Sequence, residues 1–162
     1  MLEDSKLLED FPPVETSKWE ELMPAELRER RCFYRKEDAE GCAPVRQEAG
    51  WEMAERAPLE GETVVTVGDK LFEEIARLRA LRRNNPAIRL YAQPAEQGEG
   101  PQSQLHLTVQ LLAAVLGGAD AVAAHTPLQR KILLILKHEA LLDQVADPAA
   151  GSYYIEHLTQ QH

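Results

Sequence analysis

Arginines recur on the helix predicted over residues 71–82, among them Arg79 and Arg82, and arginine suits the recognition of phosphate and carboxylate groups. A guanidinium group presents several N–H donors in a planar fork that fits phosphate and carboxylate groups. Both arginines lie in segment 71–82, where apolar residues recur at helical spacing and predict one buried stripe. Two interpretations stay open: the arginines contact a substrate, or they belong to the solvated face opposite that stripe.

The histidines and cysteines form no recognisable metal-binding pattern. Cys32 and Cys42 have no CxxC spacing, so we expect reduced thiols of the kind found in cytosolic proteins. A histidine is a good metal ligand only when its ring orientation is fixed by further hydrogen bonds. We therefore predict no metal site, and we expect all five histidines on the surface or on helix faces: His106, His125, His138, His157 and His162.

Length and charge narrow the class of protein. The chain has 162 residues, which suffices for one core and a tail but not for two full domains. Its net charge of -9 argues against binding to nucleic acid. No apolar run approaches the roughly 20 residues that span a bilayer, and the first residues do not resemble a signal peptide. We expect a cytoplasmic protein without a membrane segment.

Residues 1–60 differ from the remainder of the chain. They are rich in proline and lack sustained apolar periodicity. One short helix is predicted over 17–31, anchored by Trp19, Leu22 and Leu27, although Pro24 would interrupt it. Such a segment buries little surface alone, so we expect it to lie over the remaining domain or over another chain.

Residues 61–162 alternate between strand and helix patterns. Asp69 is the expected N-cap of the first helix, and Gly117-Gly118 is the expected positive-φ stop of the second. The expected strands are 63–67, 88–93 and 119–125, and the expected helices run from about 70 to 84 and over 102–116, 128–145 and 152–160.

This alternation predicts an α/β fold with about three parallel strands and helical crossovers. Three strands cannot close a (β/α) barrel, which needs eight strands and about 250 residues. The chain is therefore either a small open α/β layer or part of a barrel whose other strands are absent or supplied elsewhere.

Four segments, in order, resemble the methylmalonyl-CoA mutase family. Segment 71–82 is similar to the family helix "F-x-E-I-A-K-L-R-A-x-R", and segment 88–93 to the strand that enters its "H-x-Q-T-S-G" loop. Segment 113–119 looks like its "A-A-V-L-G-G" helix end. Segment 147–159 resembles the signature "D-P-x-x-G-S-Y-Y-x-E-x-L-T" almost residue for residue. The resemblance implies a partial TIM-type barrel domain over residues 61–162.

The first part of the chain resembles the opening of the small (beta) subunits of heterodimeric mutases. This likeness is carried by segments 10–14, 19–20 and 33–38, and segment 45–48 is similar to the family's "I-R-Q" stretch. In these proteins the N-terminal extension wraps the partner subunit. The resemblance thus implies that residues 1–60 are an extended, partner-wrapping segment.

The family's reaction chemistry is poorly represented. The cobalt-binding "D-x-H-x-x-G" motif does not occur, and the substrate-facing stretch of the barrel would have to lie between Pro58 and Thr63. Gln93 matches the glutamine of "Q-T-S-G", but Pro94 to Glu96 replace the rest, and Tyr91 stands where a histidine is usual. No catalytic residue is predicted, and Gln93 is the candidate cofactor contact.

The resemblance also assigns roles to residues near the two strongest motifs. Arg79 and Arg82 are candidate substrate contacts, because the corresponding family helix lies near the path of coenzyme A. Asp147 and Ser152 are expected to act as cap and turn residues, and Tyr153 and Tyr154 to pack the closing helix.

Three functions remain possible for such a chain. The first is a non-catalytic, small-subunit-like protein that supports a catalytic large subunit of an adenosylcobalamin-dependent mutase, which interconverts methylmalonyl-CoA and succinyl-CoA. The second is a minimal acyl-CoA-binding isomerase that acts as a homo-oligomer, and the third is a truncated relic. In the first case adenosylcobalamin belongs to the complex, and this chain alone binds no cofactor.

Overall fold

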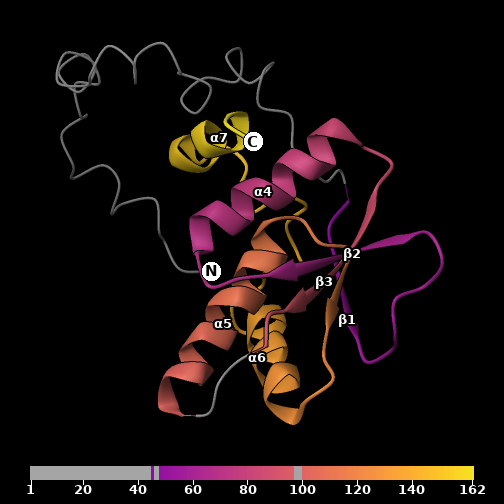
Figure 1. Ribbon diagram of the computed structural model, residues 1–162, viewed down its shortest axis with the longest axis vertical. Helices are drawn as coiled ribbons and strands as arrows, with labels where there is room; N and C mark the ends of the chain where they lie inside the picture. The colour runs from indigo at the N-terminus through magenta and orange to yellow at the C-terminus, as the bar shows by residue number, and fades with distance from the viewer. Residues whose placement is uncertain (1–44, 46–47, 97–99) are drawn as a thin grey trace, which may run out of the picture.

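The computed structural model describes residues 45, 48–96 and 100–162, and these residues form an α/β layer (Figure 1). The predicted fold class is confirmed. The strands are β1 (Glu52–Ala54), β2 (Glu62–Val67), β3 (Arg89–Pro94) and β4 (Ala121–Ala123). The helices are α4 (Leu71–Asn84), α5 (Pro101–Leu116), α6 (Pro127–His138) and α7 (Tyr153–Gln160).

The strands form one parallel sheet in the order β1-β4-β3-β2. In β2 and β3, Val65 is level with Ala92, and Ala92 is in turn level with Val122 of β4. Strands β2, β3 and β4 are neighbours in chain order, and β1 pairs with β4, the last strand of the chain. A closed (β/α) barrel has the same neighbour relations, because its first and last strands pair. The sheet is therefore an open section of such a barrel.

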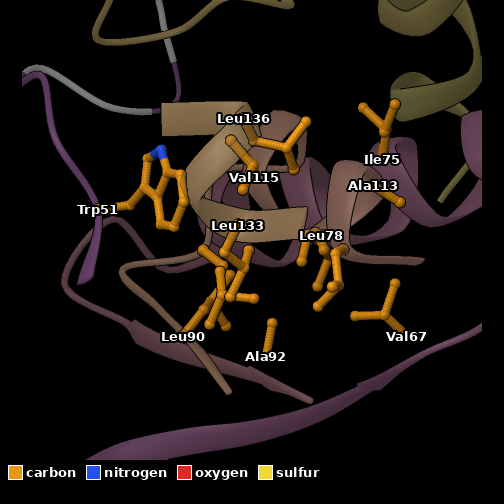
Figure 2. Packing of buried hydrophobic residues seen from close by; sticks show 14 of the residues in the cluster. Trp51, Val67, Ile75, Leu78, Leu90, Ala92, Ala113, Val115, Leu133 and Leu136 are labelled. Carbon is orange, nitrogen blue, oxygen red and sulfur yellow. The ribbon is translucent and has the colours of Figure 1, made fainter. Parts of the chain in front are cut away.

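Strand β1 was not among the three predicted strands. It is only three residues long and begins with a glutamate, so it has no apolar pattern that periodicity could detect. Trp51, directly before it, is buried near Leu133 and Leu136 (Figure 2). The sheet consequently begins before residue 60, within the part of the chain that we predicted to be an N-terminal segment.

The hydrophobic core lies between the sheet and the helices. Alternate residues of β3, Leu90 and Ala92, point into it together with Ile75 and Leu78 of α4 and Leu133 of α6 (Figure 2).

The end of α5 packs closely on α4. A Cβ atom at Gly117 would lie 2.7 Å from Leu78 Cδ1, so this contact leaves no room for a side chain. Gly118 has a φ of 87°, which confirms the predicted positive-φ stop of α5.

Three predicted boundaries were wrong. Helix α6 ends at His138 instead of residue 145, because the backbone turns at Leu141, which has a φ of 53° without being a glycine. The predicted strand 119–125 is paired only over β4. Lys70 occupies the N-cap position expected for Asp69, whose carboxylate instead lies 3.5 Å from His106 Nδ1.

The predicted helix over 17–31 lies outside the described residues. Among the helices that the structure does describe, none is long and apolar enough to cross a membrane.

Candidate functional site

Arg79 lies at the centre of a buried ion-pair cluster, which we call the Arg79 clamp. Its side chain is fully buried between α4 and α7. Nη1 donates to Asp147 Oδ1 and Nη2 to Glu156 Oε1, both at 2.5 Å. The second oxygen of Glu156 pairs with Arg83, and the second oxygen of Asp147 accepts the backbone N–H of Val45 at 2.9 Å. The Arg79 clamp therefore joins α4, α7 and the segment that precedes β1.

These contacts correct two of our interpretations. Arg79 does not belong to a solvated face of α4, because both of its partners are buried carboxylates. Asp147 does form a turn, since its backbone carbonyl accepts the N–H of Ala150, but its carboxylate is a member of the Arg79 clamp. Ser152 is at the N-cap position of α7, where its side chain makes no capping hydrogen bond.

Helix α7 begins with two tyrosines, Tyr153 and Tyr154, which we predicted to pack this helix. Tyr154 is half exposed and packs edge-on against Phe72 of α4, with 5.3 Å between ring centroids. This contact agrees with the predicted packing role of Tyr154. The side chain of Tyr153 lies outside the described part of the structure.

Arg82 forms a separate pair at the N-terminal edge of β4. Its guanidinium binds Asp120, whose carboxylate also accepts the backbone N–H of Leu90 at 2.8 Å. The side chain of Arg82 is only 11% exposed. An anionic ligand would have to displace a carboxylate from Arg79 or from Arg82, and the role of these two residues as substrate contacts stays a prediction.

The Arg79 clamp connects two of the sequence segments that resemble the family. Arg79 comes from segment 71–82, and both Asp147 and Glu156 come from segment 147–159. The matched motifs thus contain the two halves of one buried contact. The signal that could have suggested it is the presence of two carboxylates in an otherwise apolar and small-residue signature.

A second polar cluster covers the face of the sheet opposite the helices. On that face Ala54, Tyr91, Ala121 and Ala123 are buried and form their own small cluster. Above them lies Arg56, from the connection 55–61, which Figure 1 shows on the side of the sheet away from α5 and α6.

Arg56 bridges the two edge strands of the sheet. Its guanidinium donates to both carboxylate oxygens of Glu52, in β1, at 2.7 and 2.8 Å. It also donates to both oxygens of Glu62, in β2, at 2.8 and 2.9 Å. Because β1 and β2 are the outer strands, this Glu52–Arg56–Glu62 bridge spans the whole sheet.

The hydrogen bonds of Arg56 change the acidity of its partner. They lower the pKa of Glu62 to about 2, and a further hydrogen bond from the backbone N–H of Leu59 acts in the same direction. The two carboxylates also raise the pKa of Arg56 itself. Arg56 and Glu62 are thus both charged at neutral pH.

Tyr91 occupies the position where the family resemblance places a histidine. Its hydroxyl donates to the backbone carbonyl of Arg56 at 2.7 Å and lies 3.2 Å from His125 Nε2. The phenol proton is thus used at the carbonyl, which leaves the phenol oxygen free to accept a hydrogen bond from Nε2. Burial raises the pKa of Tyr91, so the phenol is neutral at physiological pH.

Gln93 is exposed at the carboxyl end of β3. Its Nε2 donates to Thr66 Oγ1 at 3.3 Å, and the neighbouring Glu96 is also exposed. His125, the histidine at the adjacent end of β4, lies 3.2 Å from the Tyr91 hydroxyl through Nε2. The role of Gln93 as a cofactor contact stays a prediction.

Arg56, Glu62 and His125 were not among the predicted site residues. These residues come together because the connection 55–61 crosses the sheet from β1 at one edge to β2 at the other. The spacing of residues in the sequence does not indicate that this connection crosses the sheet. Among the predicted residues, the structure brings Arg79 and Arg82 onto one helix, whereas Gln93 lies at the carboxyl end of β3.

Comparisons with known proteins agree with this geometry. Residues 62–162 match the sequence model of the family described as methylmalonyl-CoA mutase. The chain is 33% identical over 145 residues to the 2-hydroxyisobutanoyl-CoA mutase large subunit of Aquincola tertiaricarbonis, an alignment that covers 70% of this chain and 26% of the relative. It is 30% identical over 126 residues to a methylmalonyl-CoA mutase of Rhizobium meliloti (strain 1021), which covers 59% of this chain and 18% of that protein. The chain thus spans about a quarter or less of these relatives.

Proposed function

The chain belongs to the methylmalonyl-CoA mutase family, and we propose that it is a non-catalytic, small-subunit-like member that supports a catalytic large mutase subunit. The relative named as a large subunit supports the family assignment and leaves the type of subunit open, because it matches over only 26% of its own length.

The Glu52–Arg56–Glu62 bridge is the observation that carries the proposal. In a (β/α) barrel the loops at the carboxyl ends of the strands build the ligand site, and side chains fill the interior. Here the inner face of the sheet is covered by Arg56, by its two carboxylate partners and by the buried ring of Tyr91. An acyl-CoA on this surface would have to break four hydrogen bonds between charged groups, which are among the stronger bonds in proteins.

The remaining assignments follow from this role. We propose that the large subunit holds adenosylcobalamin and the acyl-CoA, and that the complex is a cytoplasmic heterodimer. Residues 1–60 would then be the segment that wraps the partner, and residues 61–162 the barrel domain. On this proposal the chain keeps the core between the sheet and the helices, while the covered inner face leaves no path for a substrate.

Co-purification of the full chain with the large mutase subunit of the same genome tests the proposal. The chain would carry an affinity tag, and light scattering after size exclusion would give the mass of the complex. We expect a complex of one chain with one large subunit at micromolar concentrations. Separate elution of the two proteins at about 10 µM would rule out the proposed partnership.

An activity measurement on the same samples separates support from catalysis. We expect the large subunit to have mutase activity that is more stable on heating when the chain is bound, while the chain alone has none. Turnover by the chain alone with added adenosylcobalamin would instead favour a minimal isomerase.

A further inference from the structure

Strand β2 forms one edge of the sheet, and among the described residues no strand pairs with its outer side. Residues 63–67 of this strand are all β-branched and include neither proline nor lysine, so their composition favours further strand pairing. An unpaired edge of this kind is a template for a strand of another chain. The backbone groups along the edge therefore decide what can be added there.

The outward-facing backbone groups of β2 are those of Glu62, Val64 and Thr66. In a parallel ladder every second residue directs its N–H and its C=O to the same neighbouring strand. The carbonyl of Val67 accepts the N–H of Ala95, directly after β3, so Val67 faces β3. The residues at even positions consequently face the free side of β2.

The chain itself occupies both ends of this edge. At the start of β2, the N–H of Glu62 donates to the carbonyl of Leu59 at 3.1 Å. At the other end, the carbonyl of Thr66 accepts Arg77 Nη2 at 2.7 Å. Glu74 holds the guanidinium in this place, because its Oε2 accepts Arg77 Nε at 3.1 Å. The turn and the arginine thus cap the two ends of the edge.

The contact of Arg77 removes a group that pairing between two copies would need. With Val64 opposite Thr66 of a second, antiparallel β2, these residues would exchange both of their outward hydrogen bonds. Arg77 occupies the Thr66 carbonyl and blocks that register. The register centred on Val64 would place Thr66 opposite Glu62. There the turn at Leu59 already holds the outward N–H of Glu62.

We propose that Arg77 closes the β2 edge and keeps a second copy of this chain from adding its own β2 there. A guanidinium suits this role because it places a charge at the edge and fills a backbone acceptor with the same group. The inference concerns the isolated chain and does not depend on the proposed partnership with a large subunit. The two can fail separately, because one is measured without any partner.

The variant Arg77→Ala in the full-length chain tests the cap. Sedimentation equilibrium gives the average mass of wild type and variant between about 10 and 300 µM. We expect the mass of the variant to rise with concentration to at least about 1.5 times that of wild type, because an exposed edge pairs by mass action. Arg130→Ala is the matched control, since it removes an arginine paired with Glu55 at 3.0 Å, away from β2, and should keep the wild-type mass.

A second substitution identifies the surface. Val64→Pro removes one outward N–H and leaves the ladder to β3 intact, because proline is tolerated where an edge N–H faces away from the sheet. The double variant Arg77→Ala/Val64→Pro should therefore return to the wild-type mass. Amide exchange checks the contact without this change: the N–H groups of Val64 and Thr66 in Arg77→Ala should exchange at least about threefold more slowly at the higher concentration.

Three results would overturn the proposal. The first is an equal mass for wild type and Arg77→Ala at all concentrations. The second is a larger mass of Arg77→Ala without slower exchange at Val64 and Thr66, since another surface would then pair. The third is a wild-type dimer that Val64→Pro dissociates, because the edge would then be open in spite of Arg77.

Discussion

At the residue scale, the Arg79 clamp is the feature with the largest expected contribution to stability. Arg79→Met removes the cation and leaves Asp147 and Glu156 buried without their main partner. Breaking a buried pair in this way costs about 3–5 kcal/mol, because an uncompensated charge remains in the interior. Urea unfolding at pH 7 should show a loss of that size in the free energy of unfolding.

Arg89 provides the control for this variant. Its side chain is 65% exposed, and its distance to Glu62 is 3.9 Å, so the pair is well solvated. Arg89→Met should change the free energy of unfolding by no more than about 1 kcal/mol. Equal losses in the two variants would show that the Arg79 clamp contributes no more than a surface pair.

Glu62 should give the protein an acid-sensitive contribution to stability. Its pKa is lowered in the folded state from 4.5 to about 2, so the folded protein binds this proton less readily than the unfolded chain. The contribution is fully present above pH 4.5 and is lost as the pH falls from 4.5 towards 2.

The variant Glu62→Gln isolates this contribution. The difference in unfolding free energy between wild type and variant should be constant from pH 8 to about 5 and shrink below pH 4.5. Chemical unfolding at a series of pH values measures it. A difference that stays the same down to pH 2.5 would mean that Arg56 does not stabilise the ionised carboxylate.

The sequence indicated which arginines bind anionic groups, but not which groups these are. Arg79 and Arg82 were selected because their helix resembles a family helix near the path of coenzyme A, and the anions they meet are carboxylates of the same chain. Asp147 is 68 residues away from Arg79, and Asp120 is 38 residues away from Arg82. Helical periodicity places a residue on a face, but it cannot tell whether that face meets solvent or another helix.

At the element scale, the end of α5 depends on Gly117. Its φ of -73° suits any residue, so the close approach of Leu78 and of the Ala113 carbonyl, and not the backbone conformation, excludes a side chain. Gly117→Ala would place a Cβ atom 2.7 Å from Leu78 Cδ1 and 2.8 Å from the carbonyl of Ala113. We expect a loss of about 1–3 kcal/mol in the free energy of unfolding, because such overpacking displaces α5 from α4.

Gly68 is the matched control at the other end of α4. An added Cβ there would meet only the flexible end of the Glu74 side chain, at 3.4 Å. Gly68→Ala should therefore be nearly neutral in thermal unfolding. If both alanine variants melt at the wild-type temperature, the close approach of α5 to α4 is not a constraint.

The sequence predicted long, regular elements better than short or irregular ones. Apolar periodicity and Gly118 placed α4 and α5 to within a residue or two, and β2 and β3 were found from their β-branched and apolar residues. Strand β1 was missed because three residues carry no pattern. Helix α6 was predicted too long because apolar residues continue past Leu141, whose positive φ ends the helical path.

At the scale of the whole molecule, the connection 55–61 decides what this barrel section can do. It joins β1 to β2 in seven residues, whereas parallel strands are usually joined by a crossover of a dozen or more. Arg56 in this connection ties both edges of the sheet to each other. The connection thus stands on the face where a complete barrel would hold its remaining strands and its ligand.

We expect the inner face of this barrel section to exclude the family's ligands, and calorimetric titration of the full-length chain measures this. Methylmalonyl-CoA and adenosylcobalamin would each be titrated into the protein at about 50 µM, with the large mutase subunit as a positive control. We predict that neither ligand gives a saturable heat with the chain, while both bind the control. Saturable binding of methylmalonyl-CoA to the chain, lost in Arg82→Met and retained in Arg89→Met, would contradict the claim and restore Arg82 as a substrate contact.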